Sequence, residues 1–175
     1  MLLALCTAHR VQTLSLIKLS NIKIYHNEIR INITDIIKTS KAGSEQPILR
    51  LPYFKENPKI CPAKTLEDYM SVTRSIRPMN VDSLLVTYKR PHKAPTAQSI
   101  SRWLKNVLRE SGVDVSVFSA HSTRHAATSA ARAHGASLDL IRRAAGWTSR
   151  SQTFAKFYNR PLADGGSFAE AVLLS

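Results

Sequence analysis

Apolar residues change their spacing several times along the chain, and each change predicts a different element. Residues 2–17 have the spacing of a helix, with a break near residues 7–10. Through residues 29–37, isoleucines alternate with polar side chains, which is the period-two pattern of a half-buried strand. Together with residues 22–25 this stretch predicts a β-hairpin, and residues 47–51 predict a third strand that begins with a proline.

The rest of the chain has mostly helical spacing, and small polar residues mark where the helices begin. Thr96, Ser119 and Ser137 each precede an apolar stripe, and their hydroxyls can accept hydrogen bonds from the free N–H groups of a first turn. Glycines follow the same three stripes and are expected to end those helices. These patterns predict a mainly helical α+β fold with a small antiparallel sheet. We expect an extended segment at residues 83–87 and helices over residues 62–75, 96–111, 119–135, 137–145, 149–161 and 168–174.

The net charge of the chain indicates the class of molecule that it binds. The chain has 175 residues, of which 43% are hydrophobic, enough for one domain with a core of its own. Lysine and arginine total 25 against 12 acidic residues, which gives a formal net charge of +13. A globular domain this basic most often binds a polyanion, and the sequence has no basic amphipathic helix of the kind that binds membranes. The composition therefore favours nucleic acid as the partner.

The two cysteines, Cys6 and Cys61, are too few for a disulfide framework. Both have apolar neighbours in the sequence, so we expect both to be buried free thiols in a reducing compartment. The apolar residues 1–6 are too few to cross a bilayer and lack the charged region of a secretory signal. They are typical of a helix that starts abruptly, as in a chain cut from a longer one.

The most specific chemical pattern lies in the last third of the chain. His121, Arg124, Trp147 and Tyr158 occur in this order within 38 positions. A phenol can attack a phosphodiester, a guanidinium can hold its oxygens, and an imidazole can assist. His121 and Arg124 are three residues apart and therefore lie on one face of a helix. Arg10, far upstream, is a candidate for a second guanidinium on the same phosphate.

This ordered set resembles the catalytic domain of the tyrosine recombinases, which include the phage integrases and the Cre-like recombinases. The family has an arginine near the start of the domain, a lysine from a hairpin turn, a His-x-x-Arg motif, a histidine or tryptophan after a glycine, and a nucleophilic tyrosine. The residues 145–148 are most similar to the Cre-like members, and residues 61–66 and 154–158 resemble the recombinases of eukaryotic mobile elements. The matching positions are Arg10, Lys38, His121, Arg124, Trp147 and Tyr158.

The resemblance implies a domain organisation. It predicts a mixed helical catalytic domain over residues 1–163, with the small antiparallel sheet at one edge. The family's N-terminal core-binding domain has no counterpart in this sequence, so we expect an N-terminally truncated catalytic domain. Residues 164–175 are expected to form a glycine-rich hinge and a C-terminal helix that docks on a neighbouring protomer.

The resemblance also implies a role for each matched residue. Tyr158 is expected to attack the scissile phosphorus and to leave a 3′-phosphotyrosyl link and a free 5′-hydroxyl. Arg10 and Arg124 would neutralise the non-bridging oxygens, which a planar guanidinium can bind with two N–H groups at once. His121 would bind the same phosphate or take the phenol proton. Trp147 would donate its indole N–H, and filling of the core is the alternative interpretation.

The leaving 5′-oxygen needs a proton, and two lysines compete to supply it. We favour Lys38, because a Lys-Thr pair at the end of a strand resembles the family pattern, but Lys41 is a second candidate. His125 is a candidate to join the site, with packing or a backbone hydrogen bond as its alternative. Further basic residues are expected to contact DNA: Lys41, Lys89, Arg90, Lys93, Arg102 and His125.

Three functions remain open on the sequence. The leading one is a site-specific DNA recombinase or integrase that needs no cofactor and no metal, because the phosphotyrosine keeps the energy of the cut bond. A zinc site at His121 and His125 is disfavoured, since the glutamate of a His-Glu-x-x-His motif is missing. The expected partners are double-stranded DNA and further copies of the chain in a tetrameric synapse, with no membrane, in a eukaryotic nucleus or otherwise in the cytoplasm. The alternatives are a catalytically inactive DNA-binding remnant and a type IB topoisomerase-like enzyme.

Overall fold

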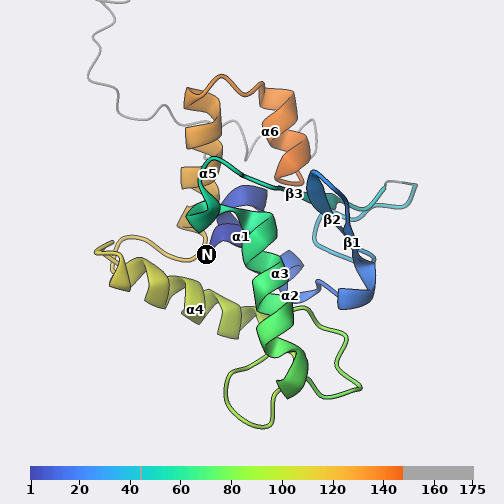
Figure 1. The fold of residues 1–175 in the computed structure, drawn as a ribbon. Helices are drawn as coiled ribbons and strands as arrows, with labels where there is room; N and C mark the ends of the chain where they lie inside the picture. The colour runs from blue at the N-terminus through green and yellow to red at the C-terminus, as the bar shows by residue number, and fades with distance from the viewer. Residues whose placement is uncertain (44, 148–175) are drawn as a thin grey trace, which may run out of the picture.

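The structure, a computed structural model, describes residues 1–43 and 45–147 (Figure 1). It has the predicted mainly helical α+β fold, with a three-stranded antiparallel sheet at one edge of the view. Tyr158 and everything else after residue 147 lie outside the described residues, including the two helices and the hinge expected there. The elements are α1 (Leu2–Thr7), α2 (Val11–Ser15), η1 (Leu19–Asn21), β1 (Ile22–Ile24), β2 (Glu28–Asn32), β3 (Ile48–Pro52), η2 (Pro58–Ile60), α3 (Pro62–Thr73), η3 (Arg74–Ile76), α4 (Ala97–Glu110), α5 (Ser122–Ala133) and α6 (Leu138–Ala144).

The helical stretch at the start of the chain is broken where the sequence predicts a break. Thr7 ends α1, and Ala8 then takes a left-handed conformation with a φ of 50°. The Thr7 hydroxyl accepts a hydrogen bond from the His9 N–H at 3.3 Å, which holds this turn. Arg10 is extended and stands at the N-cap position of α2. The break therefore buries His9 and presents Arg10 at the start of a new helix.

The sheet buries one face of alternating isoleucines and leucines. Ile29 and Ile31 of β2 pair with Leu51 and Leu49 of β3, and each of the four is at most 2% exposed. Strand β1 pairs with the other edge of β2, so the strand order is β1-β2-β3. Helices α1 and α3 pack against β3. The sheet thus supports the helix that leads into the Arg10 turn.

Strand β2 is shorter than predicted, because the chain leaves the sheet after Asn32. The Ile33 N–H still donates to a backbone carbonyl just before β3, at 3.1 Å. The Ile37 N–H donates instead to the Ser40 hydroxyl at 2.9 Å, and the Ser40 N–H donates to the Ile37 carbonyl at 2.9 Å. These bonds form a tight turn that contains Lys38, in place of the last strand residues that the alternation predicted.

Helix α5 begins at Ser122 and not at Ser119 as predicted. The Ser119 hydroxyl accepts a hydrogen bond from the His121 N–H at 3.2 Å, and the Ser119 N–H donates to the Ser122 hydroxyl at 3.0 Å. These bonds close a turn ahead of the helix and leave His121 at the N-cap position. The other two predicted caps, Thr96 and Ser137, are confirmed, since each accepts an N–H from the first turn of its helix.

One cysteine is buried and the other is exposed. Cys61 precedes α3, and its sulfur accepts a hydrogen bond from the Lys64 N–H at 3.4 Å. The prediction that Cys6 is buried is wrong, because the short helix α1 buries only Ala4 and Thr7.

The extended segment predicted at residues 83–87 is confirmed. Ser83 pairs with Lys18 in an isolated antiparallel bridge, and Leu84 and Val86 are buried. This segment ties the region after α3 to the region after α2. No helix among residues 1–43 and 45–147 is both long enough and apolar enough to pass through a bilayer.

The buried face of the sheet gives a direct test of the fold. Leu51→Ala is expected to lower the free energy of unfolding by about 2–5 kcal/mol, because it leaves a cavity beneath α1 and α3. Ile48→Ala, on the opposite face of the same strand and 52% exposed, is the matched control and is expected to cost less than about 1 kcal/mol. Urea unfolding of both variants measures the difference, and equal costs would contradict this sheet orientation.

Candidate functional site

Arg124 is the most deeply buried charged residue in the described part of the chain. It extends from the first turn of α5 and is 1% exposed. Its Nη2 donates a hydrogen bond to the carbonyl of Ala145 at 3.1 Å, and its guanidinium carbon lies 4.2 Å from the ring centroid of Trp147. A buried charge is costly unless it is hydrogen-bonded, and an indole face attracts a cation. The end of α6 and the residues after it therefore hold this guanidinium in one position.

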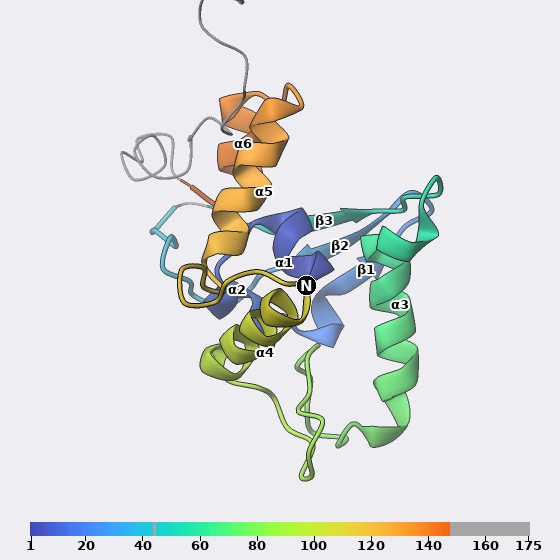
Figure 2. The same ribbon diagram turned by 90° about the vertical axis from the view of Figure 1, so that its left-hand side faces the viewer.

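Small side chains let α5 and α6 approach each other closely. Figure 2 shows the two helices side by side, and they pack together beside α1. Ala127 and Ala131 of α5 pack against the buried cluster of Ala8, Ile141, Ala145 and Trp147. Two other alanines of the same helix, Ala126 and Ala130, are exposed and take no part in this packing.

The turn after α6 brings Trp147 over Arg124. Gly146 has a φ of 68°, in the left-handed region that favours glycine, and it ends the helix as predicted. The backbone N–H of Trp147 donates a hydrogen bond to the backbone carbonyl of Arg142 at 2.8 Å, and this bond closes the turn. Trp147 is 8% exposed. Its indole therefore fills the core and lies over a cation, as the alternative interpretation predicted for the core, and donation by its indole N–H stays a prediction.

Three of the predicted catalytic residues, Arg10, Lys38 and Arg124, lie near enough to His121 to lower its pKa. Its ring lies edge-on to that of His125, with 6.1 Å between the ring centroids. Partial burial is the largest cause that lowers the pKa of His121, followed by the positive charges of Arg124, His125, Arg10 and Lys38. These groups come from α5, from the turn before α2 and from the turn after β2. Segments that are more than a hundred residues apart thus lie close enough to act on one imidazole.

The described charges at this site are positive. The described charged groups that act on His121, and both of those that act on the nearby His9, are cationic. A cluster of cations of this kind repels further cations and suits a small polyvalent anion such as a phosphate group. No three His, Cys, Asp or Glu side chains within residues 1–43 and 45–147 are arranged to hold a metal ion.

The two competing lysines differ in position. Lys38 lies in the tight turn after β2 and is close enough to lower the pKa of His121. Lys41 is exposed in the same connection, and it is not among the charges that act on His121. The turn formed by Ile37 and Ser40 therefore separates the lysines by their distance from the histidine.

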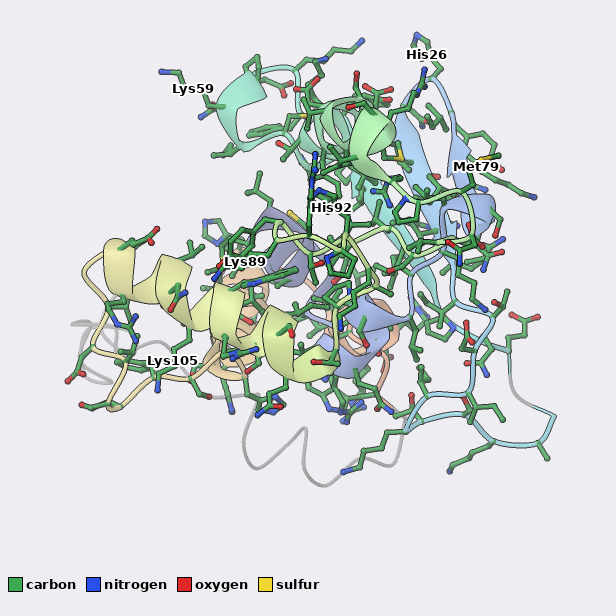
Figure 3. All side chains as sticks on the ribbon, turned by 90° about the horizontal axis from the view of Figure 1, so that it is seen from below. His26, Lys59, Met79, Lys89, His92 and Lys105 are labelled. Carbon is green, nitrogen blue, oxygen red and sulfur yellow. The ribbon has the colours of Figure 1, made fainter. Side chains whose placement is uncertain are left out.

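The other predicted DNA contacts lie apart from His121. Lys89, Arg90 and Lys93 are exposed on the loop that precedes α4, and Arg102 is exposed on α4 itself. Figure 3 labels Lys89 and His92 on this loop and Lys105 on α4. Of this predicted set, only His125 belongs to the histidine site.

The loop before α4 is held in shape by Thr87. Its N–H donates to the Lys93 carbonyl at 2.9 Å, and its hydroxyl accepts from the Lys93 N–H at 3.1 Å. The Thr87 carbonyl also bonds the Nδ1 of His92 at 2.8 Å. Lys89 lies over the ring of Tyr88, with its nitrogen 5.8 Å from the ring centroid. These hydrogen bonds close the loop, and its basic side chains extend from it.

The sequence analysis missed His9. This histidine is 4% exposed, and its ring packs against Gly146 beside Arg124. Its only signal in the sequence is its position directly before Arg10, and a lone histidine in an apolar stretch is more often part of a core. Its relation to the site depends on the fold and was not predictable from spacing.

Comparison with known proteins gives a family and a fold. The model of the Phage integrase family matches residues 1–163. No curated protein matches the sequence significantly. Among solved structures, the XerA recombinase has a TM-score of 0.65 at 17% identity, over 98% of this chain and 54% of that one.

Two further solved structures have the same fold as this chain. The XerH site-specific recombinase bound to difH substrate has a TM-score of 0.68 at 16% identity, over 91% of this chain and 41% of that one. A lambda integrase dimer bound to a COC′ core site has a TM-score of 0.59 at 16% identity, over 95% and 52%. The chain thus spans about half the length of the recombinases that it matches.

The placement of the two lysines can be tested by titration. Removing a cation near a histidine makes protonation easier, so Lys38→Gln is expected to raise the pKa of His121. Lys41→Gln is the matched control and is expected to leave that pKa unchanged. The measurement is the pH titration of the His121 ring protons by NMR. A larger change with the Lys41 variant would reverse the assignment of the two positions.

Proposed function

Because this chain belongs to the phage integrase family, we propose that it is the catalytic domain of a site-specific recombinase that cuts and rejoins DNA strands through a 3′-phosphotyrosyl intermediate. The observation that supports the proposal best is the meeting of the Arg10, Lys38 and Arg124 charges at His121. These are the residue types that a phosphoryl transfer to a phenol requires, and each comes from a different segment of the chain. We assign the catalytic domain to residues 1–163.

The proposed reaction conserves the energy of the DNA backbone. The phenolic oxygen of Tyr158 forms a bond to the scissile phosphorus while the bond to the 5′-oxygen breaks. In the reverse reaction a 5′-hydroxyl attacks the phosphotyrosyl phosphorus, the bond to the tyrosine oxygen breaks, and a phosphodiester is restored. The exchange needs no metal, nucleotide or redox cofactor, since one phosphate ester replaces another.

Arg10 and Arg124 are proposed to bind the non-bridging oxygens. Charge on these oxygens grows as the fifth bond to phosphorus forms, so donors that are already in position stabilise the transition state most. Arg124 meets this requirement, because the Ala145 carbonyl and the Trp147 ring fix its guanidinium before DNA arrives. Arg10, at the N-cap of α2, approaches from the opposite end of the chain.

His121 is proposed to take the proton of the phenol. Burial and the surrounding cations lower its pKa from the usual 6.5, so the ring is neutral at physiological pH. A neutral imidazole has one nitrogen that can accept a proton and one that can donate a hydrogen bond to phosphate. His121 is the N-cap residue of α5, so an anion bound at His121 would also lie near the free N–H groups of the first turn of that helix.

Lys38 is proposed as the acid that protonates the leaving 5′-oxygen. It shares the electrostatic environment of His121, whereas Lys41 does not, and this difference supports Lys38 over its competitor. Lys41 then serves as a contact to a neighbouring phosphate. Arg and Lys along DNA contribute mainly through such salt-sensitive phosphate contacts.

Double-stranded DNA is the proposed partner, and two of the surfaces that would contact it are described. The histidine site would bind the scissile phosphate, while the loop with Lys89, Arg90 and Lys93 and the exposed Arg102 would follow the flanking backbone. The solved XerH structure is bound to difH substrate, and the lambda integrase structure is a dimer bound to a COC′ core site. We propose a homo-oligomeric synapse joined by residues 164–175, acting in the nucleus of a eukaryotic host or otherwise in the cytoplasm.

A covalent adduct is the decisive test. A pool of nicked duplexes with random sequence is incubated with the chain, and complexes that survive denaturant are recovered and sequenced. We expect a DNA adduct with the parent and none with Tyr158→Phe, which lacks the nucleophilic oxygen, while both proteins retain DNA in a gel-shift assay. Retention without an adduct in the parent would identify an inactive DNA-binding remnant. Relaxation of supercoils without any preferred site would identify a topoisomerase-like enzyme.

The role of Lys38 can be tested with the duplex selected in that experiment. Lys38→Met is expected to slow adduct formation by at least about 100-fold, because the 5′-oxygen leaves without a proton. A substrate with sulfur at the 5′ position needs no such proton and should restore most of the rate. Lys41→Met is the matched control and is expected to react at nearly the parent rate with either substrate. Sulfur rescue of the Lys41 variant instead would assign the acid to Lys41.

A further inference from the structure

His9 is buried in the candidate site but has no part in the proposed reaction. Its ring lies directly against Gly146, so that a Cβ placed on that glycine would come within 2.8 Å of the His9 Cε1. A real Cβ cannot approach so closely. The glycine is therefore required twice, once for its φ of 68° and once for the space that the imidazole occupies.

The end of α6 also lies close to the same ring. The Ala144 backbone acts on the His9 ring as a hydrogen-bond partner that raises its pKa, and Nε2 has no hydrogen-bond partner among the described residues. The nitrogen left for this contact is Nδ1, which in its protonated form would donate to the Ala144 carbonyl. His9 thus connects the turn that carries Arg10 to the turn that carries Trp147, and these two turns are more than a hundred residues apart in the sequence.

We infer that His9 is a positioning residue, which sets Arg10 and Trp147 in register by packing against Gly146 and donating to the Ala144 carbonyl. Its main chain is adjacent to Arg10, and its ring touches the residue before Trp147. Since Trp147 covers Arg124, this single contact relates both guanidinium groups of the site to each other. The consequence for catalysis rests on the proposed function, whereas the contact itself does not.

The contact requires a neutral ring. Burial is the main cause that lowers the pKa of His9 to about 4, and the charges of Arg124 on α5 and Arg10 on the same turn lower it further. The Ala144 carbonyl on α6 opposes these effects but does not outweigh them. No other described charge acts on the ring strongly enough to shift this pKa. Protonation would place a third cation among two guanidinium groups.

The sign of the pH effect follows from this lowered value. In the unfolded chain the ring protonates near its usual pKa of 6.5, while in the folded chain it stays neutral down to about 4. Acid therefore favours the unfolded state between these two values. The folding equilibrium constant is expected to fall on the order of 100-fold through His9 alone as the pH drops from about 7.5 to about 4.5.

The test compares three variants in a Trp103→Phe background, where Trp147 is the one tryptophan left. His9→Asn keeps an N–H near the position of Nδ1 but cannot be protonated, His9→Leu removes the donor, and His26→Asn changes an exposed histidine of the β1–β2 connection as a control. The readouts are the emission maximum of Trp147 and urea unfolding, each from about pH 7.5 to about pH 4.5.

We expect the parent and His26→Asn to show buried emission at neutral pH and a red shift with loss of stability in acid. His9→Asn should keep the buried emission and lose most of the pH dependence. His9→Leu should show the red shift at every pH. If His9→Asn keeps the parent's pH dependence, or His9→Leu keeps the parent's emission, the inference is wrong.

These measurements contain no DNA, so they stand apart from the proposed reaction. If the adduct is never found but the emission behaves as expected, the positioning role stands and the recombinase proposal falls. Where the adduct is found, His9→Leu is expected to slow its formation by at least roughly tenfold and His9→Asn to restore it. An unchanged rate in His9→Leu would show that the register of the two turns does not matter for the chemistry.

Discussion

The site depends on the burial of one guanidinium. Removing a charged side chain from water costs several kcal/mol unless hydrogen bonds and nearby polarisable groups compensate. Around Arg124, the Ala145 carbonyl and the Trp147 ring do so, and both are available only because α6 ends at Ala144 and Gly146 turns the chain back. The end of one short helix therefore decides whether the most deeply buried guanidinium in the described part of the chain is held in place.

The cations gathered around this guanidinium repel one another, and the structure limits that repulsion in two ways. Burial keeps His9 and His121 neutral, so the site does not add two further charges to those of the arginines and Lys38. The local structure also holds the cationic side chains in place, since Arg10 is the N-cap residue of α2 and Lys38 lies in a turn that a hydrogen bond of Ser40 closes. A bound phosphate would relieve what repulsion remains.

Much of the fold was predictable, because it depends on local chemistry, and the structure brings Arg10, Lys38 and Arg124 close to His121, while the roles assigned to them stay predictions. The alternation around Ile29 and Ile31 allows one satisfactory arrangement, in which the isoleucines face the core. The Thr96 hydroxyl lies next to the free N–H groups of a first helical turn and accepts a hydrogen bond from one of them. The errors arose where a local signal met a competing partner. Ser119 bonds the Ser122 hydroxyl and so delays α5, while Cys6 is exposed because α1 has only one buried face. His9 could not be recognised at all, since its meaning depends on Gly146, which lies far away in the sequence.

The separation of the basic loop from the histidine site has a physical consequence for how such a protein works. Under the proposed function, phosphate contacts from Lys89, Arg90 and Lys93 would act at the end of flexible side chains and weaken as salt increases, so they would favour binding without fixing an atom. Near His121, Arg124 is buried and held by tertiary contacts, so it would fix an atom and contribute less to the total affinity. Changes in the loop should therefore alter where and how tightly DNA is held, whereas changes near Arg124 should alter what happens to it. Two tasks with opposite requirements for rigidity are divided between a surface loop and the junction of three helices.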